Sequence, residues 1–198
     1  AIRRQRQMCI RDRVKTDRWR DRYRKDCGIV VPQFFCVSDI EKEQIMSDFR
    51  IKTYVLGGVS TNCYLVFREG EKTAVIIDPA DNADYLKNKC REFGVKPEAV
   101  LLTHAHFDHM LAADDIRKAY GCKVYVHMDD ERMLNDPFLN LSGTMGTEQT
   151  GISADHLLRD GDVLHFLNRE WKVMATPGHT AGSVCYYLPE EKVPVSYT

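Results

Sequence analysis

The segment that most constrains the fold is residues 101–109, which read Leu-Leu-Thr-His-Ala-His-Phe-Asp-His. It begins in a short apolar stretch, residues 99–102, typical of a β-strand that is covered on both faces. Three histidines and an aspartate then follow within six residues. So many potential ligands at the exit of a buried strand are hard to explain as surface residues. They predict a metal site at the end of a strand.

Spacing divides these side chains into two groups. Alternate residues of an extended chain point to the same side, so His104 and His106 are expected to bind one metal ion. Asp108 and His109 fall where the chain turns into a helix, and we expect them to face a second position. A catalytic zinc ion takes three protein ligands and a water. The third ligand must come from elsewhere, and His179 supplies it from a Pro-Gly turn that follows another apolar stretch.

From about residue 46 onward, strands and helices alternate. Residues 63–67 and 73–77, separated by Glu69-Gly70, predict a hairpin, and strand–helix units follow it. The other expected strands are residues 51–56, 99–102, 123–126, 163–166, 171–175 and 183–188, and the expected helices are 81–93 and 112–120. We also expect a helix to begin within 38–45 and a long loop at 136–160 to wall a substrate pocket. Hairpins followed by strand–helix units predict an α/β sandwich with mixed sheets.

These motifs resemble those of a known family. His-Ala-His-Phe-Asp-His at 104–109 matches the HxHxDH motif of the metallo-β-lactamase superfamily. Residues 176–183 (TPGHTAGS) are similar to that family's next metal-binding segment, and residues 75–79 (VIIDP) to the strand that precedes the motif. Residues 61–64 (TNCY) are similar to the corresponding segment of small bacterial members of the glyoxalase II-like type. The whole resemblance is therefore to that type. It covers residues 46–193 and implies an αββα sandwich with mixed sheets, incomplete at the C-terminus.

The resemblance also implies a site with two metal ions. His104, His106 and His179 would bind one ion, and Asp108 and His109 would bind the other. Zinc is the expected metal, with iron and manganese as alternatives on this scaffold. Asp108 is the implied catalytic residue, which holds and orients a metal-activated hydroxide.

Two further implications concern residues outside this set. Asp78, at the end of its strand, would orient the loop or a ligand, as metal sites commonly require. The alternative is that Asp78 is simply a turn residue at the end of the strand.

The family pattern continues with an aspartate that bridges both metals and a final histidine after the strand at 183–188. The sequence up to Thr198 contains neither. We therefore expect at most one tightly bound metal and little turnover for this chain.

The ends differ in character from the middle of the chain. Residues 1–26 hold 11 Lys or Arg against 4 Asp, whereas residues 27–198 hold 17 against 25 Asp or Glu. Residues 8–13 and 195–198 resemble peptides translated from sequencing-adapter DNA. We expect residues 1–45 to be a basic extension, disordered or non-native. Residues 46–194 would form the incomplete metallo-β-lactamase-like domain, and residues 195–198 a non-native tail.

The function implied by the resemblance is metal-dependent hydrolysis of a carbonyl substrate, first of all a thioester, as in hydroxyacylglutathione hydrolase. A lactonase, a β-lactamase, a phosphodiesterase-type nuclease and an iron-dependent persulfide dioxygenase use related scaffolds and remain alternatives. A catalytically impaired metal-binding fragment is a different class. A third class is nucleic-acid binding through the basic arm, which requires an affinity that falls steeply with salt.

Composition favours a soluble, cytoplasmic protein without a membrane partner. The resemblance implies a small-molecule substrate, and a nucleic-acid partner is not expected. No stretch approaches the roughly 18 apolar residues of a membrane span, and no apolar stretch follows the first arginines, as it would in a secretory signal. The seven cysteines are odd in number, widely spaced and without a CxxC pair. They predict isolated thiols rather than disulfides or a thiolate zinc site. The sequence does not indicate an oligomeric state.

Overall fold

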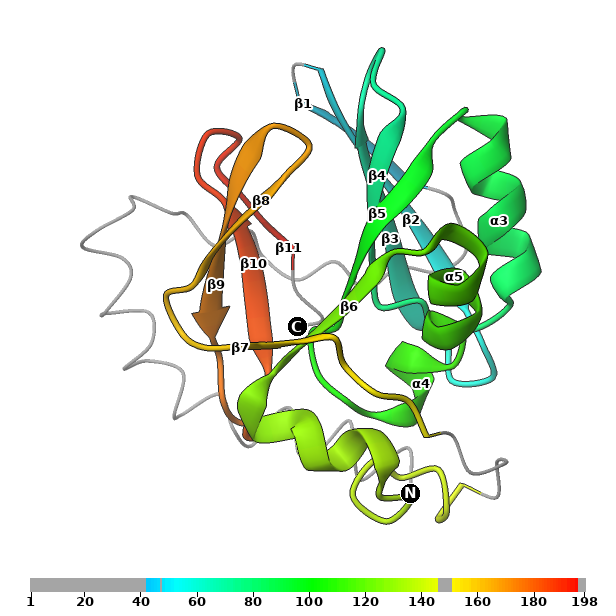
Figure 1. Cartoon of the computed structure of the whole chain (residues 1–198), viewed down its shortest axis with the longest axis vertical. Helices are drawn as coiled ribbons and strands as arrows, with labels where there is room; N and C mark the ends of the chain where they lie inside the picture. The colour runs from blue at the N-terminus through cyan, green and yellow to red at the C-terminus, as the bar shows by residue number, and fades with distance from the viewer. Residues whose placement is uncertain (1–41, 47, 146–150, 196–198) are drawn as a thin grey trace.

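A computed structural model of the chain describes residues 42–46, 48–145 and 151–195. Its strands form two sheets that pack face to face, with helices on the outer face of the larger sheet (Figure 1). The strands are β1 (Lys42–Met46), β2 (Phe49–Leu56), β3 (Thr61–Arg68), β4 (Thr73–Ile77), β5 (Lys96–Leu101), β6 (Lys123–His127), β7 (His156–Leu158), β8 (Val163–Phe166), β9 (Arg169–Ala175), β10 (Val184–Leu188) and β11 (Val193–Val195). The helices are α3 (Ala83–Glu92), α4 (Phe107–Met110), α5 (Ala113–Tyr120) and the 3-10 helix η2 (Met128–Asn135).

The larger sheet has seven strands in the order β1 to β7 and is mixed, as predicted. Strands β1 to β4 are antiparallel neighbours, and β4 to β7 are parallel. Helix α3 connects β4 to β5, and α4 and α5 connect β5 to β6 (Figure 1). The carboxyl ends of β4, β5 and β6 therefore meet at one edge of the sheet, where open α/β sheets commonly bind ligands.

The smaller sheet is antiparallel, with the order β11-β10-β9-β8. Trp171 and Tyr186 from this sheet are fully buried in a core shared with the inner face of the larger sheet. A second core, containing Leu86 and Ile116, lies between the larger sheet and its helices. Residues 99–102, at the end of β5, contribute to both cores, which explains why this stretch is apolar without interruption. The expected mixed α/β fold is confirmed, and the described residues form its helix, sheet and sheet layers.

The elements at the site were well predicted, and the exceptions are peripheral. The predicted helix within 38–45 is wrong over 42–45, because Lys42–Met46 forms strand β1 on the free edge of β2. Pairing with an open edge supplies backbone hydrogen bonds that outweigh a weak local helix preference. The expected loop at 136–160 contains strand β7, which extends the parallel half of the sheet. Strand β11 was also not predicted, and residues 146–150 lie outside the described residues.

Some predictions about the ends also lie outside the described residues, namely those on 1–41 and 196–198. Val195, which was placed in the expected tail, lies in strand β11 and pairs with Tyr186 of β10. The described cysteines are buried and form no disulfide: Cys63, Cys90, Cys122 and Cys185. Among the described helices, none has the length and apolar character needed to cross a membrane.

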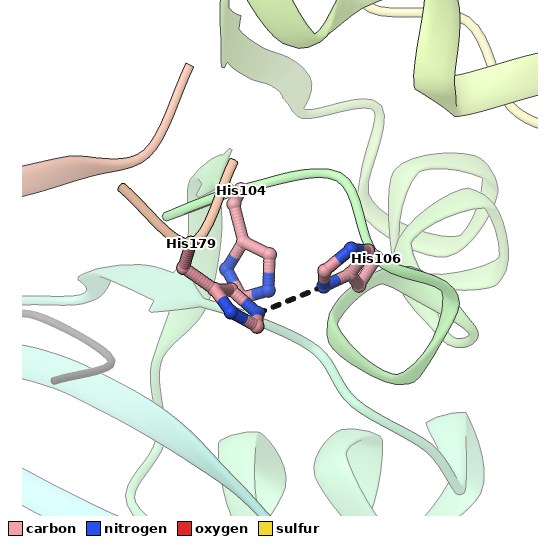
Figure 2. Close-up of side chains that lie close together, drawn as sticks. All are labelled: His104, His106 and His179. Carbon is pink, nitrogen blue, oxygen red and sulfur yellow. Dashed lines mark hydrogen bonds between the residues drawn. The ribbon is translucent and has the colours of Figure 1, made fainter. Parts of the chain in front are cut away.

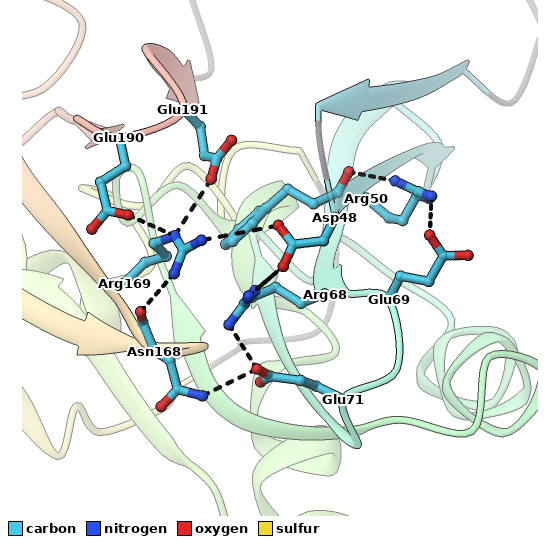
Figure 3. Close-up of polar contacts among 10 residues, drawn as sticks. Asp48, Arg50, Arg68, Glu69, Glu71, Asn168, Arg169, Glu190 and Glu191 are labelled. Atoms are coloured by element: carbon cyan, nitrogen blue, oxygen red, sulfur yellow. Dashed lines mark hydrogen bonds and ion pairs between the residues drawn. The ribbon is translucent and has the colours of Figure 1, made fainter.

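A network of ion pairs joins the two sheets at the amino-terminal end of β2 (Figure 3). Arg169 of β9 lies 2.9 Å from Glu190 and 4.0 Å from Asp48. Arg68, the last residue of β3, binds Asp48 and lies 2.7 Å from Glu71. We call this set, with Glu191, the inter-sheet ion network. It lies at the opposite end of β3 from Thr61, whose hydroxyl donates a hydrogen bond to Asp108.

Candidate metal centre

Three histidines from two separate turns converge at the carboxyl edge of the larger sheet (Figure 2). His104 and His106 follow β5, and His179 follows β9. Their potential ligand atoms all lie within 4.8 Å of one another. His106 Nδ1 is 2.9 Å from His179 Nε2, and the ring centroid of His104 is 4.7 Å from that of His179. Within the described part of the chain, this is the only group of three or more such side chains close enough to share an ion.

The turn that carries His104 is bonded to both sheets. Leu102 N donates to Tyr125 O of strand β6 at 3.0 Å. From the smaller sheet, Val184 N donates to Thr103 O at 2.8 Å, and the Tyr186 hydroxyl donates to Leu102 O at 2.8 Å. Because β10 directly follows the turn with His179, these bonds tie the two histidine-bearing turns to a common frame.

The second turn, residues 176–183, closes on itself. Thr176 N donates to Ser183 O at 2.7 Å, and Gly178 N donates to Thr180 O at 3.1 Å. Thr180 N donates to the Ser183 hydroxyl at 3.1 Å. These bonds satisfy the backbone of a short loop and fix the direction in which His179 leaves it.

Asp108 and His109 lie beside this cluster, in the single turn of helix α4. Asp108 Oδ2 is 3.5 Å from His109 Nε2, and the ring of His109 is centred 4.0 Å from that of His104. The Thr61 hydroxyl donates to Asp108 Oδ2 at 2.6 Å. The structure thus brings both predicted groups together, with three potential ligands in one and two in the other.

Asp78 follows β4 and adopts a left-handed backbone conformation, with φ of 50°. It is fully buried and accepts hydrogen bonds from Thr103 N (2.7 Å) and from the Thr103 hydroxyl (2.6 Å). It also lies 2.9 Å from His109 Nδ1. When Nδ1 donates to this carboxylate, Nε2 keeps its lone pair and faces Asp108. This geometry supports the ligand-orienting role expected of Asp78, which is at the same time a strand-end turn residue.

Burial disfavours the charged form of two histidines in the cluster. Burial lowers the pKa of His104 well below its usual range, and the nearby imidazoles of His109, His106 and His179 lower it further. Burial, assisted by His179, lowers the pKa of His106 to about 4. A histidine must be neutral to bind a metal. Clustered imidazoles next to a carboxylate are a donor set that suits zinc or iron. The residues present therefore fit a divalent transition-metal ion.

Sequence reasoning missed one residue that contacts both turns. Asp130, in η2, is fully buried and accepts a hydrogen bond from Ala105 N at 3.1 Å and from the Thr180 hydroxyl at 2.7 Å. It is distant in sequence from both turns, so no ligand spacing marks it. The available signal was its place just after strand β6, at the same sheet edge as the histidines.

Comparison with known proteins gives the family. Residues 56–195 match the Metallo-beta-lactamase superfamily. The chain is 34% identical over 142 residues to the probable metallo-hydrolase YqgX of Bacillus subtilis, covering 71% of this chain and 66% of that protein. The chain thus spans about two thirds of the length of the curated relatives it matches.

Solved structures agree. The chain is similar to the BLEG-1 B3 metallo-beta-lactamase, with a TM-score of 0.68 and 39% identity, covering 73% of this chain and 69% of that one. It is also similar to TTHA1623 in a di-iron-bound form, with a TM-score of 0.57 and 30% identity, covering 70% and 67% of the two chains.

The expected glyoxalase II-like type receives weaker support than the superfamily does. A hydroxyacylglutathione hydrolase of Salmonella paratyphi B is 32% identical over 126 residues, but this covers only 43% of that protein. The superfamily match, in contrast, includes strands β3 to β11 and every residue of the predicted site. The chain belongs to the metallo-beta-lactamase superfamily.

Proposed function

We propose that this protein is a metal-dependent hydrolase that acts on the carbonyl group of a small molecule, first of all a thioester. The observation that carries the proposal is the convergence of His104, His106 and His179 from two turns, with Asp108 beside them. Superfamily membership supports the hydrolase class, and the donor set supports the metal dependence.

Each residue has a proposed role. His104, His106 and His179 hold one ion, and Asp108 and His109 face a second position. A bound zinc ion supplies Lewis acidity to the carbonyl oxygen and lowers the pKa of water from 15.7 to about 7. Asp108 orients the attacking water, and its own orientation comes from the hydroxyl of Thr61. No serine or cysteine nucleophile is needed in this scheme.

The thioester is favoured by likeness and by the surface next to the site. The chain resembles a hydroxyacylglutathione hydrolase over 64% of its length. Asn140 O accepts a hydrogen bond from Phe107 N at 3.0 Å, so residues 136–145 lie against the start of α4. In that segment Phe138 is 76% exposed and Leu139 44% exposed. Apolar surface of this kind suits the acyl portion of a substrate.

A β-lactam is the second candidate, because of the 39% identity to the BLEG-1 B3 metallo-beta-lactamase. Its hydrolysis uses the same chemistry on an amide carbonyl, so the residue roles above do not change. The two candidates differ in whether the loops around the site accept a β-lactam ring or the acyl chain of a thioester.

The test is hydrolysis by the purified, zinc-loaded chain of four substrates: an acyl-glutathione thioester, a chromogenic cephalosporin, a lactone and a phosphodiester. Turnover should be low for all four, as expected of this chain, with the thioester cleaved fastest, and a chelator or Asp108→Asn should abolish the activity that is measured. The matched control is Asp115→Asn, on the outer helix α5. Preferential cleavage of the cephalosporin would replace the thioester assignment with the second candidate. Failure to cleave any of the four would contradict the proposed function.

A further inference from the structure

The carboxyl group of Asp130 lies between the two turns that carry the histidine cluster. It is fully buried. Its Oδ2 accepts from Ala105 N at 3.1 Å and from the Thr180 hydroxyl at 2.7 Å, and its Oδ1 accepts from Gly182 N at 2.8 Å. One side chain thus accepts three hydrogen bonds from two segments that are far apart in the sequence.

The donors sit next to the histidines themselves. Ala105 is the residue between His104 and His106, and Thr180 directly follows His179. Moving the Asp130 carboxyl would therefore shift the backbone on which each imidazole is mounted. The 2.9 Å approach of His106 to His179 depends on both turns keeping this separation.

Gly182 gives a second and independent observation. A Cβ atom at this position would lie 2.7 Å from Asp130 Cγ and 2.8 Å from Asp130 N. These distances are shorter than real Cβ contacts, and a backbone nitrogen cannot move aside cheaply. The turn with His179 thus approaches η2 as closely as a glycine permits.

Helix η2 provides a fixed base for this contact. Its Leu134 is buried in the core beneath the helices, and Ile152 N donates to Leu134 O at 3.3 Å. At its start, Asp129 N donates to His127 Nδ1 at 3.3 Å. The carboxyl of Asp130 is therefore presented from an element anchored at both ends.

We propose that Asp130 is a positioning residue that sets the distance between the two histidine turns, and through it the affinity and geometry of the metal centre. This inference rests on the proposed function, since it takes His104, His106 and His179 as the ligands. A purely structural role for Asp130 would lower stability but leave the metal affinity of the folded protein unchanged.

Two substitutions isolate this role. In Asp130→Asn the amide NH2 replaces one oxygen. Whichever way the amide turns, that NH2 faces a backbone N–H, of either Ala105 or Gly182, so one bond becomes a clash between donors. Thr180→Val removes the third donor, whereas Thr180→Ser keeps the hydroxyl and its 2.8 Å contact with Ser183 Oγ.

Asp155→Asn is the matched control. Asp155 accepts from Val124 N at 2.9 Å and pairs with Lys123 at 3.1 Å. It therefore also ties a loop to strand β6, but at the end of the strand remote from the histidine turns.

The experiment is titration of the metal-free full-length chain with Co²⁺, followed by the visible absorption spectrum, with circular dichroism to establish that each variant is folded. For Asp130→Asn and Thr180→Val we expect the dissociation constant of the first Co²⁺ to rise by about 10- to 100-fold, as for other residues that orient metal ligands. We expect their absorption bands to change as well. Thr180→Ser and Asp155→Asn should match the unmodified chain.

The outcomes separate the two proposals. If the unmodified chain binds Co²⁺ and Asp130→Asn binds it equally, with the same spectrum, the inference is overturned and the proposed function stands. If the unmodified chain binds no Co²⁺, the proposed function fails and the inference fails with it. If Asp130→Asn does not fold, Thr180→Val against Thr180→Ser decides, and equal affinities would overturn the inference.

Discussion

His106 is subject to two effects that both favour a neutral imidazole. It is buried, and a second imidazole, that of His179, lies at hydrogen-bond distance. Both effects disfavour the charged ring, and together they hold its pKa at about 4. In the unfolded chain the same side chain has a pKa near 6.5. The difference makes the free energy of unfolding dependent on pH.

The direction of this dependence follows from proton binding. Between pH 6.5 and about 4, the unfolded state binds a proton at His106 that the folded state does not. Stability is therefore complete above pH 6.5 and falls as the pH is lowered through this window, by on the order of 3 kcal/mol from this residue. His104 acts in the same direction. Urea unfolding of the metal-free chain at pH 7, 6, 5 and 4.5 measures it.

His106→Asn should make this profile shallower, whereas the same change at the exposed His165 of β8 should leave it unaltered. A free energy of unfolding that stays constant between pH 7 and 4.5 would contradict the burial of neutral imidazoles.

Thr61 tests the role assigned to Asp108. Its buried hydroxyl donates to Asp108 Oδ2 at 2.6 Å, and a hydrogen bond to a charged group is commonly worth about 1.5–3 kcal/mol. We expect Thr61→Val to lower kcat for the hydrolysed substrate by about tenfold or more, since a tenfold effect corresponds to about 1.4 kcal/mol. Thr61→Ser retains the hydroxyl and should retain kcat. Equal kcat values for Thr61→Val and Thr61→Ser would show that the hydroxyl of Thr61 does not orient Asp108.

At the scale of elements, strands β5 and β10 bring the two histidine turns together. They belong to different sheets, and the Tyr186 hydroxyl bridges them by donating to Leu102 O at 2.8 Å. Burial raises the pKa of Tyr186 well above its usual range, so the hydroxyl keeps its proton and remains a donor at any ordinary pH. The bond lies two residues from His104.

Tyr186→Phe removes this bond without changing the volume of the ring. We expect the free energy of unfolding to fall by about 1–2 kcal/mol, because the buried Leu102 carbonyl loses a partner. Urea denaturation measures the change. Tyr125→Phe, on the half-buried ring that stacks on His156, is the matched control and should cost less. A larger loss for the control would show that the β5–β10 bridge is not a principal link.

The sequence identified those parts of the site that depend on local geometry. His104 and His106 followed from their spacing after a buried strand, and His179 from its turn. Asp130 could not be identified in this way, because its three bonds connect segments that only tertiary packing brings together. Strand β1 was missed for the same reason, because its extended conformation depends on pairing with the edge of β2 rather than on a pattern in its own residues.

At the scale of the whole molecule, the metal centre and the inter-sheet ion network lie at opposite ends of β3. Thr61, at one end, contacts Asp108, and Arg68, at the other end, belongs to the inter-sheet ion network (Figure 3). These seven steps of extended chain span about 23 Å. Exposed charges at that distance are largely screened at physiological ionic strength.

Asp48→Asn should therefore weaken the network without affecting the metal centre. We expect a lower urea midpoint that depends on salt concentration, and a zinc dissociation constant equal to that of the unmodified chain. Arg50→Met, which breaks a neighbouring pair with Glu69 in the same region, is the matched control for loss of a single surface ion pair. A weaker zinc affinity in Asp48→Asn would contradict the separation.

The central claim is that two turns from different sheets supply three imidazoles to one ion. The described residues offer three ligands at this position and two at the next, so the first equivalent of zinc should bind there. X-ray absorption at the zinc edge, on the chain loaded with one equivalent, tests this directly. We expect three imidazole nitrogens at about 2.0–2.1 Å, reduced to two by His179→Asn. A shell containing sulfur, or one that His179→Asn leaves unchanged, would contradict it.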